Sequence, residues 1–306
     1  MNQNLSVILV SYNTKEITSE CLSRLKTAIS YTEEKLNNKV EVIVVDNDSQ
    51  DGSVEMIRQD HSWVKVIATG QNLGFGVGNN VGIKQSKYPY ILLLNTDAYI
   101  EKDTLEKSLT FFAEHPDCDL FTCRLTFKNH TLQPNAGFLP TPFRTAIWLL
   151  GFEALPGVKD IFPSVHKRNH SFYSQIRQPE WVMGAYFMFK REVFEKTLGF
   201  DEKIFMYMEE VEWCIRIKKL GFKTYFSPDF SVVHLGGASS GFNIGVPLYR
   251  EMEGLKYVYK KHYPAWQIYL KIIIMLGCLM RIIAFSLLGK FSRVKAYMQV
   301  LQKILK

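Results

Sequence analysis

Four short polar segments carry the side chains best suited to hold a nucleotide, and each follows an apolar run. The segments are Ser11 to Thr14, Asp46 to Ser53, Asn72 to Asn80, and Asn95-Thr96-Asp97. An acidic side chain at the end of a strand can accept hydrogen bonds from a ribose or a base edge. Glycines such as Gly74, Gly76 and Gly78 let a backbone approach a phosphate closely. Together the four segments predict a nucleotide site.

Simpler interpretations of these segments stay open. Asp48 to Ser53 could form only a helix cap and a turn, and the glycine run could be a loop that closes tightly over the sheet. The glycines are spaced GxGxG rather than GxGxxG, and no GxxxxGK[ST] sequence is present, so neither common phosphate loop is matched. A nucleotide site of this kind needs a cation. Asp97 could ligate Mg²⁺ or Mn²⁺ together with phosphate oxygens of the substrate.

The spacing of apolar residues predicts the elements that must position these segments. Buried strands are expected at 5–10, 40–45, 63–68 and 90–94, with helices between them at about 15–30, 51–59 and 78–86. This alternation predicts a doubly wound α/β fold, with a mostly parallel central sheet and helices on its faces. Ligands of such sheets bind beyond the carboxyl ends of the strands, where the four polar segments begin.

The second half of the chain has a different rhythm. The elements expected there are a helix at 104–115, strands at 119–127 and 182–189, helices at 191–197 and 206–220, and strands at 224–226 and 231–234. The stretch 130–179 is rich in Pro, His and aromatic residues and has no periodicity that assigns it to helix or strand. Loops of this length inside a domain are usually functional or mobile.

Composition indicates a folded globular protein, because 47% of the 306 residues are hydrophobic and 22% are charged. Five scattered cysteines without a CxxC pair, and a start without a secretory signal pattern, predict a protein on the cytoplasmic side. The net charge of +7 is uneven: residues 250–306 hold eleven Lys and Arg against two Glu, and residues 1–249 hold 26 against 28 Asp and Glu. We therefore predict a globular domain at 1–249 and a basic extension at 250–306.

The extension combines its charge with a long apolar run. Residues 265–289 could span a bilayer, but Arg281 inside the run costs about 2.5–3.5 kcal/mol on insertion scales and favours an interfacial or re-entrant helix. Residues 290–306 have the pattern of an amphipathic helix, so 265–306 is expected to bind an anionic membrane surface. A hairpin packed on the domain, or on a second subunit of a homo-oligomer, is the alternative. Nucleic acid is not an expected partner, because the charge is not spread over a folded face with interleaved aromatics.

The order of the motifs resembles the family 2 glycosyltransferases of the GT-A fold. The matching segments are SVILVSYN, VIVVDNDSQDGS, NLGFGVGNN, LLLNTDA, WVMGAYFMFKREVF, GFDEKIFMYMEEVEWCIR and VVHLGG, collinear over residues 5–237. The chain is most similar to the rhamnosyltransferase-like branch that builds bacterial surface polysaccharides. The resemblance implies metal-assisted, inverting transfer of a sugar from a nucleotide diphosphate donor to a glycan or lipid-linked acceptor. Rhamnose from a dTDP- or UDP-sugar is the first expectation, and UDP-galactose, UDP-GlcNAc or UDP-galactofuranose is the alternative.

The resemblance also implies roles for residues on the donor side. Residues that would line the base pocket or cradle the donor are Ser11, Tyr12, Asn13, Asp46, Asn72, Gly74, Phe75, Gly76, Asn79, Asn95 and Thr96. Asn95-Thr96-Asp97 stands in place of the family's DxD motif, with only its last position acidic. Asp97 and His234 would then hold Mn²⁺ or Mg²⁺. On its own, His234 could be an ordinary histidine at a strand end.

Glu210 stands where the family has its presumed base, within Glu209-Glu210-Val211-Glu212 in place of Glu-Asp-x-Asp. A carboxylate there would take the proton of the attacking acceptor hydroxyl. Glu212 lies four residues before Arg216 and is interpreted as half of a helical ion pair. Residues on the acceptor side would be Trp181, Gly184, Ala185 and Glu209. A reductase or nucleotidyltransferase would need a first-turn glycine fingerprint or a second carboxylate at the sheet tip, and the sequence has neither.

Overall fold

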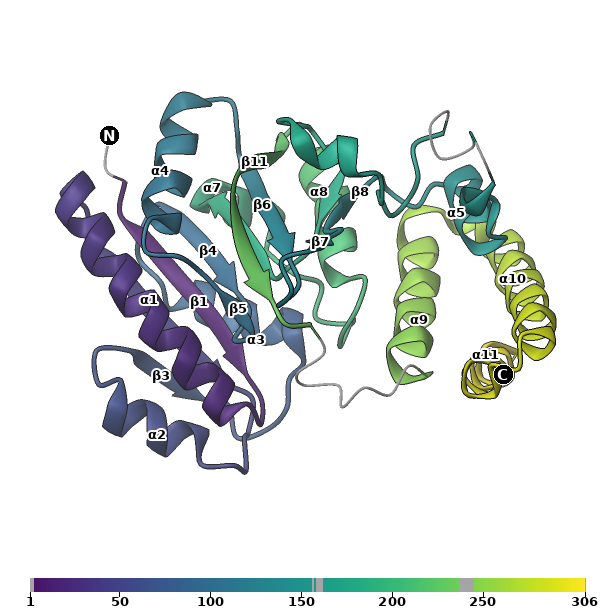
Figure 1. Cartoon of the computed structure of the whole chain (residues 1–306), viewed down its shortest axis with the longest axis horizontal. Coiled ribbons are helices and arrows are strands. Elements are labelled where there is room, and N and C mark those ends of the chain that lie inside the picture. Colours follow the sequence, from purple (N-terminus) through teal and green to yellow (C-terminus); the bar gives the residue numbers. More distant parts are fainter. Residues whose placement is uncertain (1–2, 156, 158–161, 237–244, 306) are drawn as a thin grey trace.

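The computed structural model describes residues 3–155, 157, 162–236 and 245–305 (Figure 1). One end of the molecule is a sheet with helices on both faces, and the other end is a group of C-terminal helices. The predicted α/β class is therefore confirmed, as is a C-terminal helical region.

The central sheet is mixed, with the strand order β3-β2-β1-β4-β10-β6-β11-β5 and β7 paired to β6. Its strands are β1 Leu5–Ser11, β2 Val40–Asp46, β3 Lys65–Ala68, β4 Tyr90–Leu94, β5 Ala98–Tyr99, β6 Leu120–Thr126, β7 Leu132–Gln133, β10 Tyr186–Lys190 and β11 Thr224–His234. The first four pair in parallel, as predicted. β10 runs antiparallel between β4 and β6, and β11 is parallel to β6.

Two cores lie on the two faces of this sheet. The helices on one face are α1 Lys15–Leu36, α2 Ser53–Asp60 and α4 Thr104–Glu114, and those on the other are α3 Phe75–Lys84, α7 Arg191–Thr197 and α8 Glu209–Lys219. Along β1, Val7 and Leu9 pack into the first core and Ile8 into the second, all fully buried. Both faces of the strand are covered, which explains its nearly continuous apolar sequence.

The glycine run, for which a loop over the sheet was an open interpretation, lies at the start of a helix. Gly74 caps α3, and the helix begins at Phe75, three residues before the predicted start. The backbone of Gly74 is left-handed, with φ of 82°, and a Cβ there would collide with the carbonyl oxygen of Phe205. A Cβ on Gly82 would collide with the side chain of Ile8 in β1. The glycines therefore let a helix lie against the sheet and against the segment before α8.

The stretch 130–179 holds several short elements. They are β7, β8 Ala136–Gly137, α5 Pro142–Leu149, and two 3-10 turns at Phe152–Ala154 and His170–Ser174. β8 pairs with β9 Trp181–Val182, so the predicted strand at 182–189 is interrupted before β10 begins at Tyr186. The two strands predicted at 224–226 and 231–234 are one strand, β11, with an irregularity between Ser227 and Ser231.

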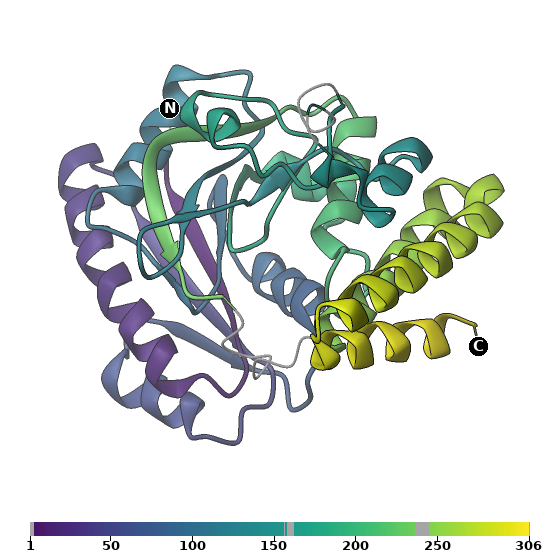
Figure 2. The same cartoon turned by 45° about the vertical axis from the view of Figure 1, so that its right-hand side comes forward.

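The last part of the chain forms α9 Gly245–His262, a 3-10 turn at Pro264–Trp266, α10 Gln267–Leu287 and α11 Phe291–Leu305 (Figure 2). The predicted boundary between residues 249 and 250 falls inside α9. α10 packs on α5, α9 and α11. Arg281 faces this packed side, and its guanidinium donates hydrogen bonds to the carbonyl oxygens of Trp148 and Leu149 at the end of α5. The charge within the apolar run is thus satisfied by backbone carbonyls at a helix C-terminus.

Candidate active site

A cavity of about 400 Å³, the donor-side cavity, lies beyond the carboxyl ends of β1 and β4. Seven predicted site residues line it, namely Tyr12, Asn72, Gly74, Phe75, Asn95, Thr96 and Asp97. Asn47, directly after β2, lines it too, so all four polar segments of the sequence meet here. The remaining wall comes from residues 205–207 and from the first turns of α9.

Asp46 and Asn13 lie beside the cavity and shape its rim. Asp46 is fully buried, and its carboxylate accepts hydrogen bonds from the backbone N–H of Ser49 at 2.9 Å and the Ser49 hydroxyl at 2.7 Å. Asn13 donates its backbone N–H to Ser49 Oγ and accepts from the backbone N–H of Gln50. In this structure both residues brace the loop after β2.

Three other predicted donor residues lie behind the cavity wall. Ser11 is fully buried, within 3.4 Å of the Thr18 hydroxyl. Gly76 lies against the side chain of Phe200, where a Cβ would be 2.9 Å from the Phe200 Cβ. Asn79 donates a hydrogen bond from Nδ2 to the carbonyl oxygen of Phe75. These residues hold the helix and strand that carry the lining side chains.

Asp97 and His234 meet at one end of the donor-side cavity, although 137 positions separate them in the sequence. His234 Nε2 lies 3.2 Å from Asp97 Oδ1, and the backbone N–H of Gly236 donates to Asp97 Oδ2 at 3.1 Å. Burial alone would raise the pKa of Asp97, but the hydrogen bond and charge of His234 and the Gly236 N–H outweigh it and lower that pKa. Asp97 is therefore ionised at neutral pH.

The chemistry of this pair fits a divalent cation. Without a cation, His234 Nε2 can hydrogen-bond to the Asp97 carboxylate, while Nδ1 lies 3.0 Å from Gln133 Oε1. In the neutral tautomer with its proton on Nδ1, Nε2 could instead ligate a cation beside Asp97. Within the described ranges, no group of three or more His, Cys, Asp or Glu side chains could hold a metal alone. The donor phosphates would have to share the ion, as is common for Mg²⁺.

Glu209 and Glu210 begin α8 on the far side of Gly184 from the donor-side cavity. Gly184 lies against the ring of Phe75, where a Cβ would stand 2.9 Å from two ring carbons. Burial, with a smaller contribution from Glu251, raises the pKa of Glu210 to about 7, although hydrogen bonds from the backbone of Glu210 and Gly184 and the charge of His166 act to lower it. Burial first, and then the Glu210 charge, raise the pKa of Glu209 well above its usual range. One carboxyl of the pair is thus protonated and the other titrates near neutrality.

The predicted acceptor-side residues form the strand and turn next to Glu210. Trp181 is buried and donates its indole N–H to the carbonyl oxygen of Val165 at 2.7 Å. The carbonyl of Ala185 accepts a hydrogen bond from the backbone N–H of Asn95, which ties this turn to the donor side. Gly184 lies between Glu210 and Phe75, because only a residue without a side chain fits against the Phe75 ring.

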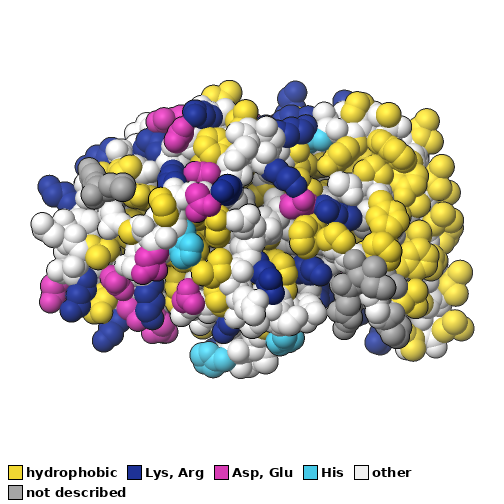
Figure 3. Space-filling view, turned by 90° about the horizontal axis from the view of Figure 1, so that it is seen from above, with side chains coloured by type: hydrophobic (Ala, Val, Ile, Leu, Met, Phe, Trp, Pro, Cys, Tyr) yellow, Lys and Arg dark blue, Asp and Glu magenta, His cyan; other side chains and the backbone are white. Residues whose placement is uncertain are grey.

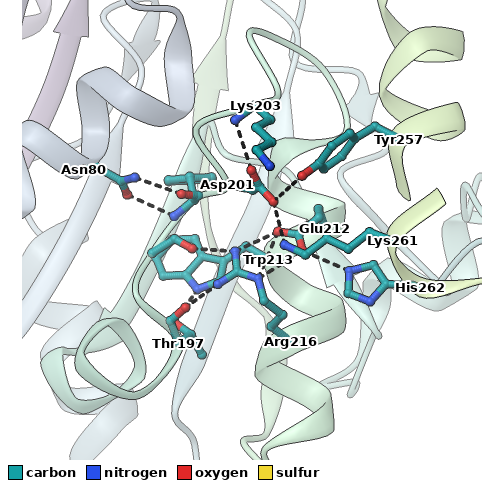
Figure 4. A network of polar contacts seen from close by, with 12 residues as sticks. Asn80, Thr197, Asp201, Lys203, Glu212, Trp213, Arg216, Tyr257, Lys261 and His262 are labelled. Carbon is teal, nitrogen blue, oxygen red and sulfur yellow. Dashed lines mark hydrogen bonds and ion pairs between the residues drawn. The ribbon is translucent and has the colours of Figure 1, made fainter. Parts of the chain in front are cut away.

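Glu212 is the centre of a buried polar network that joins α8 to α9 (Figure 4). Its carboxylate pairs with Arg216 at 2.7 Å, as the sequence predicted, and also with Lys261 at 2.8 Å and His262 at 2.9 Å. Burial would raise the pKa of Glu212, but the hydrogen bonds of His262, Arg216 and Lys261 lower it to about 2. This network fixes the helix that carries Glu210 against the helix that closes the donor-side cavity.

Two residues that the sequence did not single out complete the donor-side cavity. Arg250 reaches it from α9, with its guanidinium 4.6 Å above the ring of Phe205 and no ion pair to any carboxylate that the structure describes. Gln133, in β7, orients His234. Neither belongs to a motif, so only the fold reveals them.

Comparison with known proteins agrees with this geometry. Residues 6–216 match the family described as Glycosyl transferase family 2. The chain belongs to glycosyl transferase family 2. It is therefore a glycosyltransferase, and both the predicted family and the predicted enzyme class are confirmed.

Two bacterial relatives support the rhamnosyltransferase-like branch. This glycosyltransferase is 25% identical over 255 residues to the N-acetylglucosaminyl-diphospho-decaprenol L-rhamnosyltransferase of Mycobacterium tuberculosis. The alignment covers 79% of each chain. It is 22% identical over 294 residues to the dTDP-rhamnosyl transferase RfbF of Shigella flexneri, which covers 86% of this chain and 83% of RfbF.

A solved structure supports the fold. The mannosyltransferase PcManGT from Pyrobaculum calidifontis, in complex with GDP-Man and Mn²⁺, has a TM-score of 0.56 at 16% identity and covers 98% of this glycosyltransferase and 74% of its own chain. At this identity the likeness speaks for the GT-A fold alone, which agrees with the predicted architecture.

Proposed function

We propose that this glycosyltransferase transfers a sugar, with inversion, from a nucleotide diphosphate donor to a glycan or lipid-linked acceptor, with Glu210 as the base. The observation that carries the proposal is the place of Glu210. Its carboxyl faces the backbone of Gly184, which packs directly on Phe75 of the donor-side cavity. An acceptor hydroxyl between them would face both a base and the anomeric carbon of a bound donor.

The charged groups in and beside the donor-side cavity suit the two events of such a reaction, the loss of the acceptor's proton and the departure of the diphosphate. Glu210, with its pKa near 7, can accept the acceptor's proton and is more basic than an ordinary carboxylate. Arg250 would contact the diphosphate as it leaves, because a guanidinium binds phosphate oxygens well. Asp97 and His234 would hold Mn²⁺ or Mg²⁺, and such an ion, when bound, neutralises charge on the leaving diphosphate.

The donor is inferred from the relatives. Both are named rhamnosyltransferases, and one is named for a dTDP-linked donor. Rhamnose from dTDP-rhamnose is therefore the first candidate. The acceptor named for the M. tuberculosis relative is a sugar linked through a diphosphate to a lipid, and we infer an acceptor of the same class here.

The surface of α10 supports work at a membrane. The stretch Pro264–Leu287 is long and apolar enough to cross a bilayer, and only 28% of its most apolar part is buried. Its exposed apolar side chains recur at helical spacing, at Ile268, Ile272, Leu276, Ile283 and Leu287. Figure 3 shows apolar side chains gathered over the end of the molecule where α5 and the C-terminal helices lie. Because Arg281 points into the protein, this apolar face can rest on the cytoplasmic leaflet without burying a charge.

The test is a transfer assay with the full chain in detergent, Mn²⁺, and a short lipid-diphosphate GlcNAc acceptor. Parallel reactions contain dTDP-rhamnose, UDP-galactose, UDP-GlcNAc or UDP-galactofuranose. We expect the highest turnover with dTDP-rhamnose and loss of turnover in EDTA. Transfer from a UDP-sugar alone would correct the donor, unchanged turnover in EDTA would refute the metal role, and no transfer from any donor would refute the function.

A matched pair of variants locates the cation. Asp97→Asn should lower turnover by about 100-fold or more, because it removes the charged ligand beside the diphosphate. Asp117→Asn makes the same change in an exposed ion pair with Lys223 and should leave turnover unaltered. Both proteins should keep their melting temperature within a few degrees.

A further inference from the structure

A second and larger cavity, of about 710 Å³, lies between the C-terminal helices and the end of α5. We call it the helical cavity. Its walls come from α9, α10, α11, residues 148–153 and residues 164–169. None of the motifs of the sequence reaches it, and the donor-side residues do not line it.

The helical cavity is electropositive. Four cationic side chains line it, Lys167, Arg168, Arg281 and Arg293, against two carboxyls, Glu153 and Glu251. Among the described residues, none of the three arginines forms an ion pair with a carboxylate. Arg281 is bonded to backbone carbonyls, and Arg293 lies 5.2 Å from the ring of Phe285. With His166 neutral the lining carries a net charge of +2.

The two carboxyls do not cancel this field. Glu153 is surrounded by His166, Arg168, Lys167 and Arg281, yet burial outweighs their charges and raises its pKa. Its Oε1 is buried without a hydrogen-bond partner. Glu251 lies 3.6 Å from His166 Nε2. The cavity therefore offers more positive than negative charge to an incoming group.

The helical cavity adjoins the reaction centre. Val246, Pro247 and Arg250 of α9 face the donor-side cavity, whereas Leu248, Glu251 and Met252 of the same helix face the helical cavity. One helix is thus the wall between the two. His166 and Glu251 line the helical cavity and also act on the pKa of Glu210. The His166 ring packs on Trp181, one of the predicted acceptor-side residues, at 5.3 Å.

The outer wall of the helical cavity is the helix with the exposed apolar face. Ile274, Gly277, Cys278 and Arg281 of α10 line the cavity, and Ile268, Ile272, Ile283 and Leu287 are exposed on the same helix. A ligand that enters here meets positive charge inside and apolar surface outside. That pairing matches an amphiphile with an anionic head.

We propose that the helical cavity binds the diphosphate of a lipid-linked acceptor and presents its sugar to Glu210. The net charge of +2 complements a diphosphate diester, which carries two negative charges. The lipid would leave along α10, and the sugar would extend past His166 and Trp181. The inference rests on the proposed transfer to a lipid-linked acceptor, and it adds the site and the residues that recognise the phosphates.

A binding experiment tests the site without requiring transfer. Farnesyl diphosphate is titrated into the full chain in detergent, with dTDP and Mn²⁺ present in excess to occupy the donor-side cavity. We expect the double variant Arg168→Gln, Arg293→Gln to weaken binding by about tenfold or more, because two charge-assisted contacts are lost. Both side chains are exposed, so the fold should persist. The double variant Lys290→Gln, Lys295→Gln makes an equal charge change at two exposed residues outside the cavity, and it should leave the affinity within about twofold.

Two further binding measurements test whether charge, rather than structural damage, explains the change in affinity. Farnesol, which lacks the phosphates, should bind the wild type and the double variant equally. Glu153→Gln, measured at alkaline pH so that Glu153 is ionised in the wild type despite its raised pKa, removes a negative charge from the cavity and should tighten the binding of farnesyl diphosphate. Mere structural damage would not produce this change of sign. In transfer assays the double variant should raise the acceptor KM and leave the donor KM unchanged.

Other results would overturn the inference. Equal affinity of the wild type and the double variant for farnesyl diphosphate would do so. A double variant that keeps this affinity but no longer binds phosphatidylglycerol vesicles would assign the arginines to membrane phospholipid instead. If the charge-dependent binding is found but no donor supports transfer, the cavity stands and the proposed function fails.

Discussion

The two cavities on either side of α9 are built in different ways. The donor-side cavity is made of residues that directly follow parallel strands, and its one ligand-like pair is Asp97 with His234. The helical cavity is made of side chains from five separate segments, and its character comes from cations. This difference fits the two proposals, in which a rigid sheet edge binds the nucleotide and a helical, apolar surface binds a lipid-linked acceptor.

The largest expected effect concerns the residue between the cavities. Glu210→Gln should lower turnover by about 100- to 10,000-fold, because general-base assistance is lost. Donor affinity should persist, because Glu210 is outside the donor-side lining. The turnover of the purified variant measures the first effect, and its affinity for the donor nucleotide measures the second.

Glu209→Gln is the matched control for that variant. The pKa of Glu209 is raised well above its usual range, so its side chain is already protonated and a glutamine replaces it without a change of charge. Turnover should stay within about tenfold of the wild type. If Glu209→Gln is the inactive variant and Glu210→Gln the active one, the base has been assigned to the wrong carboxylate.

The next effect concerns the buried polar network between α8 and α9. Glu212→Gln leaves Arg216, Lys261 and His262 without a buried carboxylate, and should cost about 3–5 kcal/mol of unfolding free energy. Glu192→Gln breaks an exposed i,i+4 pair with Lys196 and should leave the unfolding free energy almost unchanged, because solvent screens that pair. Denaturant unfolding measures the two, and equal costs would contradict the buried network.

The same network predicts how stability depends on pH. The pKa of Glu212, about 2, is below that of a glutamate in the unfolded chain, so the ionised Glu212 stabilises the fold above about pH 4.5. This contribution falls as the pH drops from there toward 2. The Glu212→Gln variant should lack that part of the acid-induced loss.

The smallest expected effect concerns the outer face of α10. Leu287→Asp should weaken co-sedimentation with anionic vesicles by about tenfold, because it removes an apolar contact with the membrane and adds repulsion. Leu198→Asp makes the same change at a residue of similar exposure, 79% against 84%, next to α7 in the sheet domain. Equal loss in both variants would show that α10 is not the attachment surface.

The sequence predicts the donor-side cavity better than it predicts the helical cavity. Strand ends could be found because buried parallel strands have continuous apolar runs, and the polar residues after them meet at one sheet edge. A loop remained an open interpretation of the glycine run because glycine's usual role is a turn, whereas here close packing against Ile8 and Phe205 requires glycine inside and before a helix.

The residues that sequence reasoning missed are those placed by tertiary contacts alone. Gln133, Arg250 and His166 lie in segments without clear periodicity or motif, and their partners are far away in the chain. From the sequence, Arg281 counts against a simple membrane span, but its hydrogen-bond partners cannot be predicted. Only the position of α5, whose last carbonyls accept its hydrogen bonds, turns it toward the protein.

The most direct test of the central claim, that Glu210 is the base between two cavities, is the pH dependence of kcat. Burial makes the largest contribution to the rise of the Glu210 pKa to about 7, and Glu251 and His166 are the charged side chains that act on it, while Glu210 in turn raises the pKa of Glu209. Because the base must be ionised, wild-type kcat should be constant above that pH and fall about tenfold per unit below it, and Glu210→Gln should have no such limb. A wild-type kcat that is flat between pH 5.5 and 8, about a unit or more on either side of this pKa, would contradict the account.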